Sequence, residues 1–172
     1  FRAWEWYLLN AMTRKPGLTE LVGHKGSVNE IAVFPDHERL ASVGDDGTLR
    51  IWNLRTRELI KVWKLGENPL YSVAISPDGS HLAYVANQRL YLRSLDELDV
   101  TPVAGSEAGR ANGFTSAPFF SPDGRWIAFW QEQQLRKVAV GGGAPTTICN
   151  LSTPPYGASW GPNDEILIGT GH

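Results

Sequence analysis

The stretch Asp46-Gly47-Thr48-Leu49-Arg50-Ile51-Trp52-Asn53 decides the fold, together with the pair Gly23-His24 that precedes it. The dipeptide Asp-Gly suits a tight turn, and the residues after it form a short strand that ends on an aromatic side chain. A Gly-His pair followed by short strands and such a turn is typical of one four-stranded blade of a repeat protein. The stretch therefore predicts small antiparallel sheets that recur along the chain.

A tetrapeptide centred on proline returns four times along the chain. Its copies are Phe34-Pro35-Asp36-His37, Ser76-Pro77-Asp78-Gly79, Ser121-Pro122-Asp123-Gly124 and Gly161-Pro162-Asn163-Asp164, with prolines 42, 45 and 40 residues apart. Proline ends a strand, and Asp and Gly suit the turn that sends the chain back antiparallel. A period of about 40 to 50 residues is typical of β-propeller blades.

The residues around each turn predict the strands. First strands end at Val33, Ile75, Phe120 and Trp160, and second strands contain Leu40-Ala41, Leu82-Ala83, Ile127-Ala128 and Ile166-Leu167. We expect third strands at 48–54, 89–95 and 134–140, and outer strands at 58–65, 100–105 and 145–151. The fourth repeat has strands at 156–161 and 165–169 only. The fold class expected is all-β, a propeller segment of about three and a half four-stranded blades.

The domain boundaries expected from these repeats begin with a short N-terminal helix in a lead-in over residues 1–17. Its apolar positions Trp4, Tyr7, Leu8 and Met12 have helical spacing. Residues 18–23 suit the outer strand of a preceding or closing blade, followed by blades at 24–65, 66–105 and 106–151 and a partial blade at 152–172. Three arrangements remain open: a fragment of a longer chain, two copies that close one ring, or a chain that closes alone.

The first blade resembles the WD40 repeat family. The resemblance implies that His24, Ser42, Asp46 and Trp52 form the hydrogen-bonded tetrad of that family, a structural role in which Asp46 accepts from His24. The second and third blades, with Arg93 and Ala139 at the position of the tetrad tryptophan, instead resemble the TolB-like PD40 repeat. Residues 2–8, followed soon by Gly23-His24, look like the junction ahead of the propeller in bacterial proteins that carry a serine/threonine kinase.

Composition and motifs exclude several functions. The net charge of −2 leaves no nucleic-acid footprint, and the basic residues Arg50, Arg55, Arg57, Lys61 and Lys64 suit a solvated outer face better than a phosphate-binding patch. Cys149 is the single cysteine, so we expect no intrachain disulfide and no zinc arrangement. No apolar run is long enough to insert into a membrane, and no catalytic or cofactor motif is present. We expect no catalytic residue, no metal and no cofactor.

Two functions remain open. The first is a non-catalytic interaction module, a protein scaffold or sensor that binds a protein or peptide, with a homodimer that completes a ring as a further arrangement. The second is the propeller part of an enzyme or transport accessory whose chemistry lies outside this segment. The loop at 105–116 is the candidate ligand face, because Glu107, Arg110, Asn112 and Phe114 combine charge, amide and aromatic groups. A mobile connector is the alternative for this loop. The composition fits the cytoplasm and the bacterial envelope equally.

Overall fold

The computed structural model describes residues 20–96, 100–107 and 116–170, and every element within these ranges is a β-strand. The strands are β1 Val28–Val33, β2 Arg39–Gly44, β3 Thr48–Asn53, β4 Leu59–Lys64, β5 Ser72–Ile75, β6 His81–Ala86, β7 Arg89–Ser94, β8 Val100–Pro102, β9 Ser116–Phe120, β10 Trp126–Gln131, β11 Gln134–Ala139, β12 Thr146–Asn150, β13 Gly157–Trp160 and β14 Ile166–Gly169. The helix expected within 1–17 lies outside the described residues.

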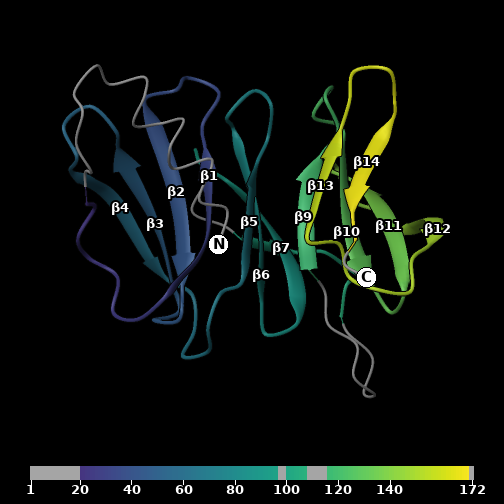
Figure 1. Cartoon of the computed structure of the whole chain (residues 1–172), viewed down its shortest axis with the longest axis horizontal. Coiled ribbons are helices and arrows are strands. Elements are labelled where there is room, and N and C mark those ends of the chain that lie inside the picture. The colour runs from purple at the N-terminus through teal and green to yellow at the C-terminus, as the bar shows by residue number, and fades with distance from the viewer. Residues whose placement is uncertain (1–19, 97–99, 108–115, 171–172) are drawn as a thin grey trace.

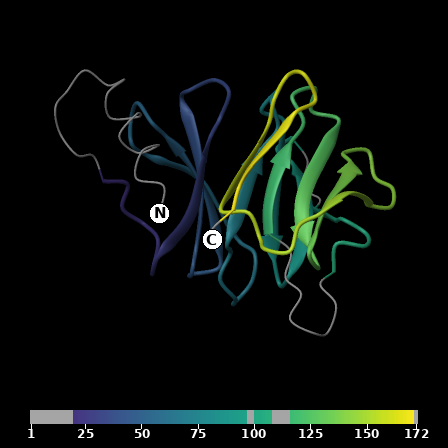
Figure 2. The ribbon, with the colours of Figure 1, turned by 45° about the vertical axis from the view of Figure 1, so that its right-hand side comes forward.

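The strands form three four-stranded antiparallel sheets and one two-stranded sheet (Figure 1). Each complete sheet pairs its strands in chain order, β1 to β4, β5 to β8 and β9 to β12, and β13 pairs with β14. The first strands of successive sheets contact one another, β1 with β5, β5 with β9, and β9 with β13. The sheets follow one another across the molecule in both ribbon views (Figure 2). This arrangement confirms the expected fold, a propeller segment of three complete blades and a partial one.

The turn between the first two strands of each blade is built by the proline tetrapeptide. The residue two positions after each proline has a left-handed backbone: His37, Gly79, Gly124 and Asp164 have φ of 57°, 73°, 70° and 63°. In the second blade the Ser76 hydroxyl donates to Asp78, which also accepts from the Ser80 amide at 3.0 Å. These hydrogen bonds lower the pKa of Asp78 to about 2. The repeated tetrapeptide thus sends the chain back in the same way in every blade.

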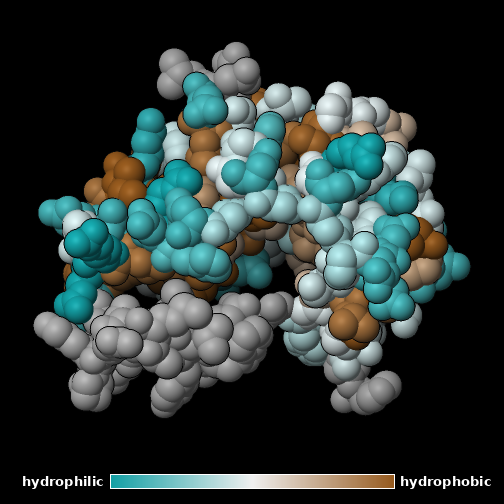
Figure 3. All heavy atoms as spheres, turned by 90° about the horizontal axis from the view of Figure 1, so that it is seen from above, coloured by the Kyte–Doolittle hydropathy of each residue, from teal (hydrophilic) through white to brown (hydrophobic). Residues whose placement is uncertain are grey.

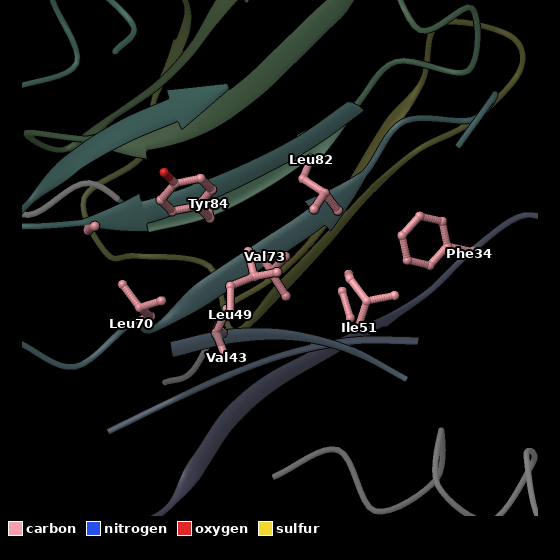
Figure 4. Close-up of a cluster of buried hydrophobic side chains, with 10 residues drawn as sticks. Phe34, Val43, Leu49, Ile51, Leu70, Val73, Leu82 and Tyr84 are labelled. Carbon is pink, nitrogen blue, oxygen red and sulfur yellow. The ribbon is translucent and has the colours of Figure 1, made fainter. Parts of the chain in front are cut away.

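The cores lie between neighbouring blades. Figure 4 shows the first, where side chains of both blades meet: Phe34, Val43, Leu49 and Ile51 from the first blade and its turn, Leu70 from the connecting loop, and Val73, Leu82 and Tyr84 from the second blade. A second cluster joins blades two and three through residues that include Val85, Leu90, Phe120 and Phe129. A third joins blade three to the partial blade through Phe119, Ala128, Leu135 and Trp160. Burial of these faces against each other stabilises the stack, at about 25 cal/mol per Å² of apolar surface.

Strand pairing corrects one alignment between the blades. Trp52 lies opposite Leu40, and the equivalent pairs in the next blades are Leu82 with Arg93 and Ile127 with Val138. Val138, and not Ala139, therefore occupies the position of the tetrad tryptophan in the third blade. The expected position was one residue too late because the hairpin from β10 to β11 has a turn of only two residues, Glu132 and Gln133.

The segment before β1 takes a different form from the one expected. Residues 20–23, the described part of the outer strand expected at 18–23, belong to no described strand. Gly23 lies instead against the side chains of Arg50 and Trp52, so close that a Cβ at this position would collide with both. The segment therefore covers a face of the first blade and leads directly into His24.

Candidate functional site

The four residues predicted as a tetrad lie together in the first blade. His24 Nδ1 lies 2.9 Å from Asp46 Oδ1, and His24 Nε2 lies 2.7 Å from the Ser42 hydroxyl. The indole N–H of Trp52 donates to the same hydroxyl at 2.8 Å. A carboxylate only accepts, so we assign the proton of the neutral ring to Nδ1, and Nε2 then accepts from Ser42. The four groups form one continuous chain of hydrogen bonds.

Asp46 collects more donors than the histidine alone. The Lys25 amide donates to Oδ2 at 2.9 Å, and the hydroxyl and amide of Thr48 donate to Oδ1 at 2.7 and 3.2 Å. Arg50 Nη2 lies 3.3 Å from Oδ2. Burial by itself raises the pKa of Asp46, but the hydrogen bonds from Lys25, Thr48 and His24 outweigh it and hold the pKa well below its usual value. Asp46 is therefore a permanent anion that ties the segment before β1 to the β2–β3 turn.

The turns and connections at this end of the strands are joined across the blades. Asn29 Nδ2 donates to Asp45 Oδ1 at 2.8 Å and to the carbonyl of Leu70 at 3.0 Å. Asn68, in the connection from β4 to β5, donates to Asn87 in the β6–β7 turn at 2.8 Å. We call this end of the sheets the loop face; it consists of the turns 44–47, 87–88 and 132–133 and the connections 66–71, 103–115 and 151–156. Its described parts are held in place by contacts between blades.

The described base of the 105–116 loop is anchored by a polar network. Glu107 forms an ion pair with Arg89 at 2.7 Å, and its carbonyl accepts from the buried Gln131 amide at 2.6 Å. The Gln131 side-chain oxygen accepts in turn from Arg136 at 2.8 Å, and Arg136 also donates to the Gly105 carbonyl at 3.3 Å. Of the four residues predicted for the ligand face, Glu107 lies here, and Arg110, Asn112 and Phe114 lie outside the described residues.

Two exposed tyrosines on the loop face were not singled out from the sequence. Tyr71 is 62% exposed and Tyr156 is 80% exposed. Each directly precedes the first strand of its blade, because Tyr71 stands six residues before Pro77 and Tyr156 six before Pro162. The same offset from the repeated proline was the signal that could have identified them. An exposed aromatic ring on a fixed backbone suits recognition of another surface.

The described ranges hold no metal centre and no membrane span. Within them, no group of three or more His, Cys, Asp or Glu side chains is placed to hold a metal ion. No helix in the same part of the chain is long and apolar enough to cross a bilayer. The chemistry that remains visible on the loop face is that of hydrogen bonding, aromatic contact and ion pairing.

Fold and repeats together define the chain as a β-propeller repeat protein. Residues 16–53 match the WD40 family, described as WD domain, G-beta repeat. Residues 43–136, more than half of the chain, match the family described as Dipeptidyl peptidase IV (DPP IV) N-terminal region. The chain belongs to this second family, and its first blade carries the WD40 pattern. The two matches agree with the mixture of repeat styles read from the blades.

Curated relatives share the WD40 part. The chain is 37% identical over 79 residues to eukaryotic translation initiation factor 3 subunit I of Aspergillus fumigatus, a match that covers 45% of this chain and 23% of the relative. It is 38% identical over 76 residues to a guanine nucleotide-binding protein subunit beta of Arabidopsis thaliana, covering 41% and 20%. The matched segment thus spans less than a quarter of either relative. Both relatives are eukaryotic, and both are subunits by name.

Proposed function

We propose that the chain is a non-catalytic interaction module that binds a protein or peptide partner on its loop face. The observation that carries the proposal is the pair of exposed tyrosines, Tyr71 and Tyr156, on a face whose turns and connections are bonded across blades. Rings held on a fixed backbone lose little conformational entropy on binding, which favours recognition. WD40 repeat proteins act as protein-interaction scaffolds, and the relatives of the first blade are subunits of larger assemblies by name.

The finer parts of the proposal rest on the sequence. We place the module in a larger bacterial signalling protein, from the resemblance of residues 2–8 and the mixed repeats to kinase-linked propellers. Arg110, Asn112 and Phe114 add charge, an amide and an aromatic ring to the same connection as Glu107. The partner is not a nucleic acid, because the net charge is −2. A homodimer that completes one ring remains part of the proposal.

A second candidate function is supported by the family match. Residues 43–136 belong to a family named after the N-terminal region of a peptidase. The segment would then be the propeller part of an enzyme or transport accessory, with the reacting groups supplied from outside these 172 residues. Fold alone does not decide between the two functions.

Capture of a partner from native lysate tests the interaction module. One bait carries Tyr71→Ala with Tyr156→Ala, a second carries Arg110→Ala with Phe114→Ala, and a third carries Arg39→Ala with Arg125→Ala. The third is the matched control, because both arginines lie in exposed turns at the opposite end of the strands. We expect the first two baits to lose the partner that the parent chain retains, with unchanged circular dichroism, and the third to retain it. Undiminished capture by the first two baits would remove the loop face as the binding surface.

A further inference from the structure

The outer strand of the first blade exposes apolar side chains beside cations. On β4, Leu59, Ile60 and Val62 are 41%, 51% and 47% exposed. The neighbouring cations Arg55, Arg57 and Lys61 are exposed as well. Figure 3 shows hydrophobic and hydrophilic surface intermixed at the left-hand end of the molecule, which carries this blade. Exposed apolar residues on an edge strand are a known site for pairing with another chain.

The backbone of β4 is open to a further strand. Among the described strands, β4 pairs only with β3 and forms the edge of its sheet. The Leu65 amide donates inward to the Gly47 carbonyl at 2.9 Å. Because hydrogen-bonding direction alternates along an antiparallel strand, the N–H and C=O groups of Val62 and Lys64 point away from β3. The bulge in β4 falls before Lys61, so the run from Lys61 to Lys64 is regular.

The outer strand of the second blade is closed at the same position. Val62 pairs with Arg50, and its counterpart Pro102 pairs with Tyr91, the residue equivalent to Arg50. The Val103 amide donates inward to Leu90 at 2.9 Å, so residue 102 is the one that faces outward. Proline has no N–H to offer there, and this is a common way to block a sheet edge.

The outer strand of the third blade is closed in another way. Thr147, the counterpart of Val62, pairs with Arg136, and a bulge interrupts the register directly beside it, at Ile148. The Thr147 hydroxyl also donates to Gln134 at 3.0 Å. Pro102 and Thr147 are exposed although their blades follow another blade in the stack. The exposure of Val62 therefore belongs to its position on the outer strand and does not require the absence of a neighbouring blade.

We propose that β4 accepts an extended acidic segment of a partner protein as a fifth strand. Backbone groups of Val62 and Lys64 would pair with the incoming strand, and its apolar side chains would cover Leu59, Ile60 and Val62. Lys61, which lies over the Trp63 ring at 5.4 Å, and the exposed Arg55 and Arg57 favour carboxylates on that strand. A second copy is the less suitable occupant, since two β4 edges would bring lysines opposite each other.

Peptide binding to the whole chain tests the proposal. The probe is a fluorescein-labelled octapeptide of alternating valine and glutamate, and its matched control alternates valine and lysine. Fluorescence anisotropy should show that the glutamate peptide binds about tenfold or more tightly than the lysine peptide, with an advantage that falls as salt is added. Equal binding of the two peptides, or no binding of either, would overturn the proposal.

Variants of β4 separate backbone pairing from charge. Val62→Pro removes the outward N–H and should abolish binding, whereas Val62→Ala keeps the N–H and should retain most of it. Arg57→Glu with Lys61→Glu should reverse the preference toward the lysine peptide, whereas Arg125→Glu at the opposite end of the strands should not. If Val62→Pro fails to fold, the charge reversal decides. Unchanged preference after reversal, or self-association in sedimentation that Val62→Ala retains and the charge reversal leaves unaltered, would show that the edge serves another occupant.

Discussion

Asp46 is the residue on which the first blade depends most. It accepts hydrogen bonds from His24, Lys25 and Thr48, and the chain continues from His24 to Ser42 and Trp52. Substitution Asp46→Ala leaves these donors unpaired in a poorly solvated site, so we expect the free energy of unfolding to fall by about 1 to 3 kcal/mol. Urea unfolding followed by circular dichroism measures the change.

The adjacent aspartate is the matched control for this measurement. Asp45 is exposed and accepts one hydrogen bond, from Asn29. We expect Asp45→Ala to change the free energy of unfolding by less than about 0.5 kcal/mol. Equal effects of the two substitutions would mean that Asp46 is an ordinary turn residue and that the tetrad does not stabilise the blade.

The depressed pKa of Asp46 also predicts how stability depends on pH. A carboxyl whose pKa is lower in the folded chain than its unfolded value of 3.8 stabilises the fold fully above that value. The contribution is lost as the pH falls from about 4 toward the lower folded pKa. We expect the free energy of unfolding to drop in this window in urea titrations at stepped pH, and the drop to be smaller in Asp46→Asn. An identical acid limb in both chains would contradict the assignment.

At the scale of the elements, the repeated proline turn predicted the strands well and the hairpin turns poorly. Proline fixes where a first strand ends, so the positions of the second and third strands follow by simple spacing. The two-residue turns are different, because Glu132 and Gln133 both take φ above zero, at 50° and 61°, without the Asn or Gly that usually marks such a turn. The misplacement of Ala139 for Val138 follows from this unmarked turn.

The β10–β11 turn offers a test of stored backbone strain. Replacing Glu132-Gln133 by Asn-Gly supplies residues that adopt the left-handed region easily, so we expect the free energy of unfolding to rise by about 1 kcal/mol. Gln133→Ala is the control, since it removes the side chain and leaves the backbone conformation in place. Thermal and urea unfolding would contradict the interpretation if both variants shifted stability equally.

Contacts between blades account for what the sequence did not reveal about the site. The network from Arg89 through Glu107 and Gln131 to Arg136 joins residues of two strands, a turn and a loop base. Nothing in local spacing indicates that these side chains meet. Exposure is equally non-local, because the apolar residues of β4 alternate as a buried strand would and only the packed structure leaves Ile60 and Val62 uncovered.

At the scale of the whole molecule, successive blades hold the loops on one face of a rigid stack. The inner strands start at the same end, so Tyr71 and Tyr156 lie on one face, and the proline turns lie on the other. The buried clusters between blades fix the blades relative to each other. Such a scaffold can present loops for recognition without changing shape itself.

Hydrogen exchange of the whole chain, with and without the partner captured in the lysate experiment, tests most directly whether the loop face binds. We expect the partner to slow exchange in the segments 66–71, 87–89, 132–134 and 152–156, whose amides lie at this face. Exchange in the proline turns at 34–39, 76–81 and 121–126 should stay unchanged. Protection of the proline turns with unchanged exchange on the loop face would contradict the proposed interaction module.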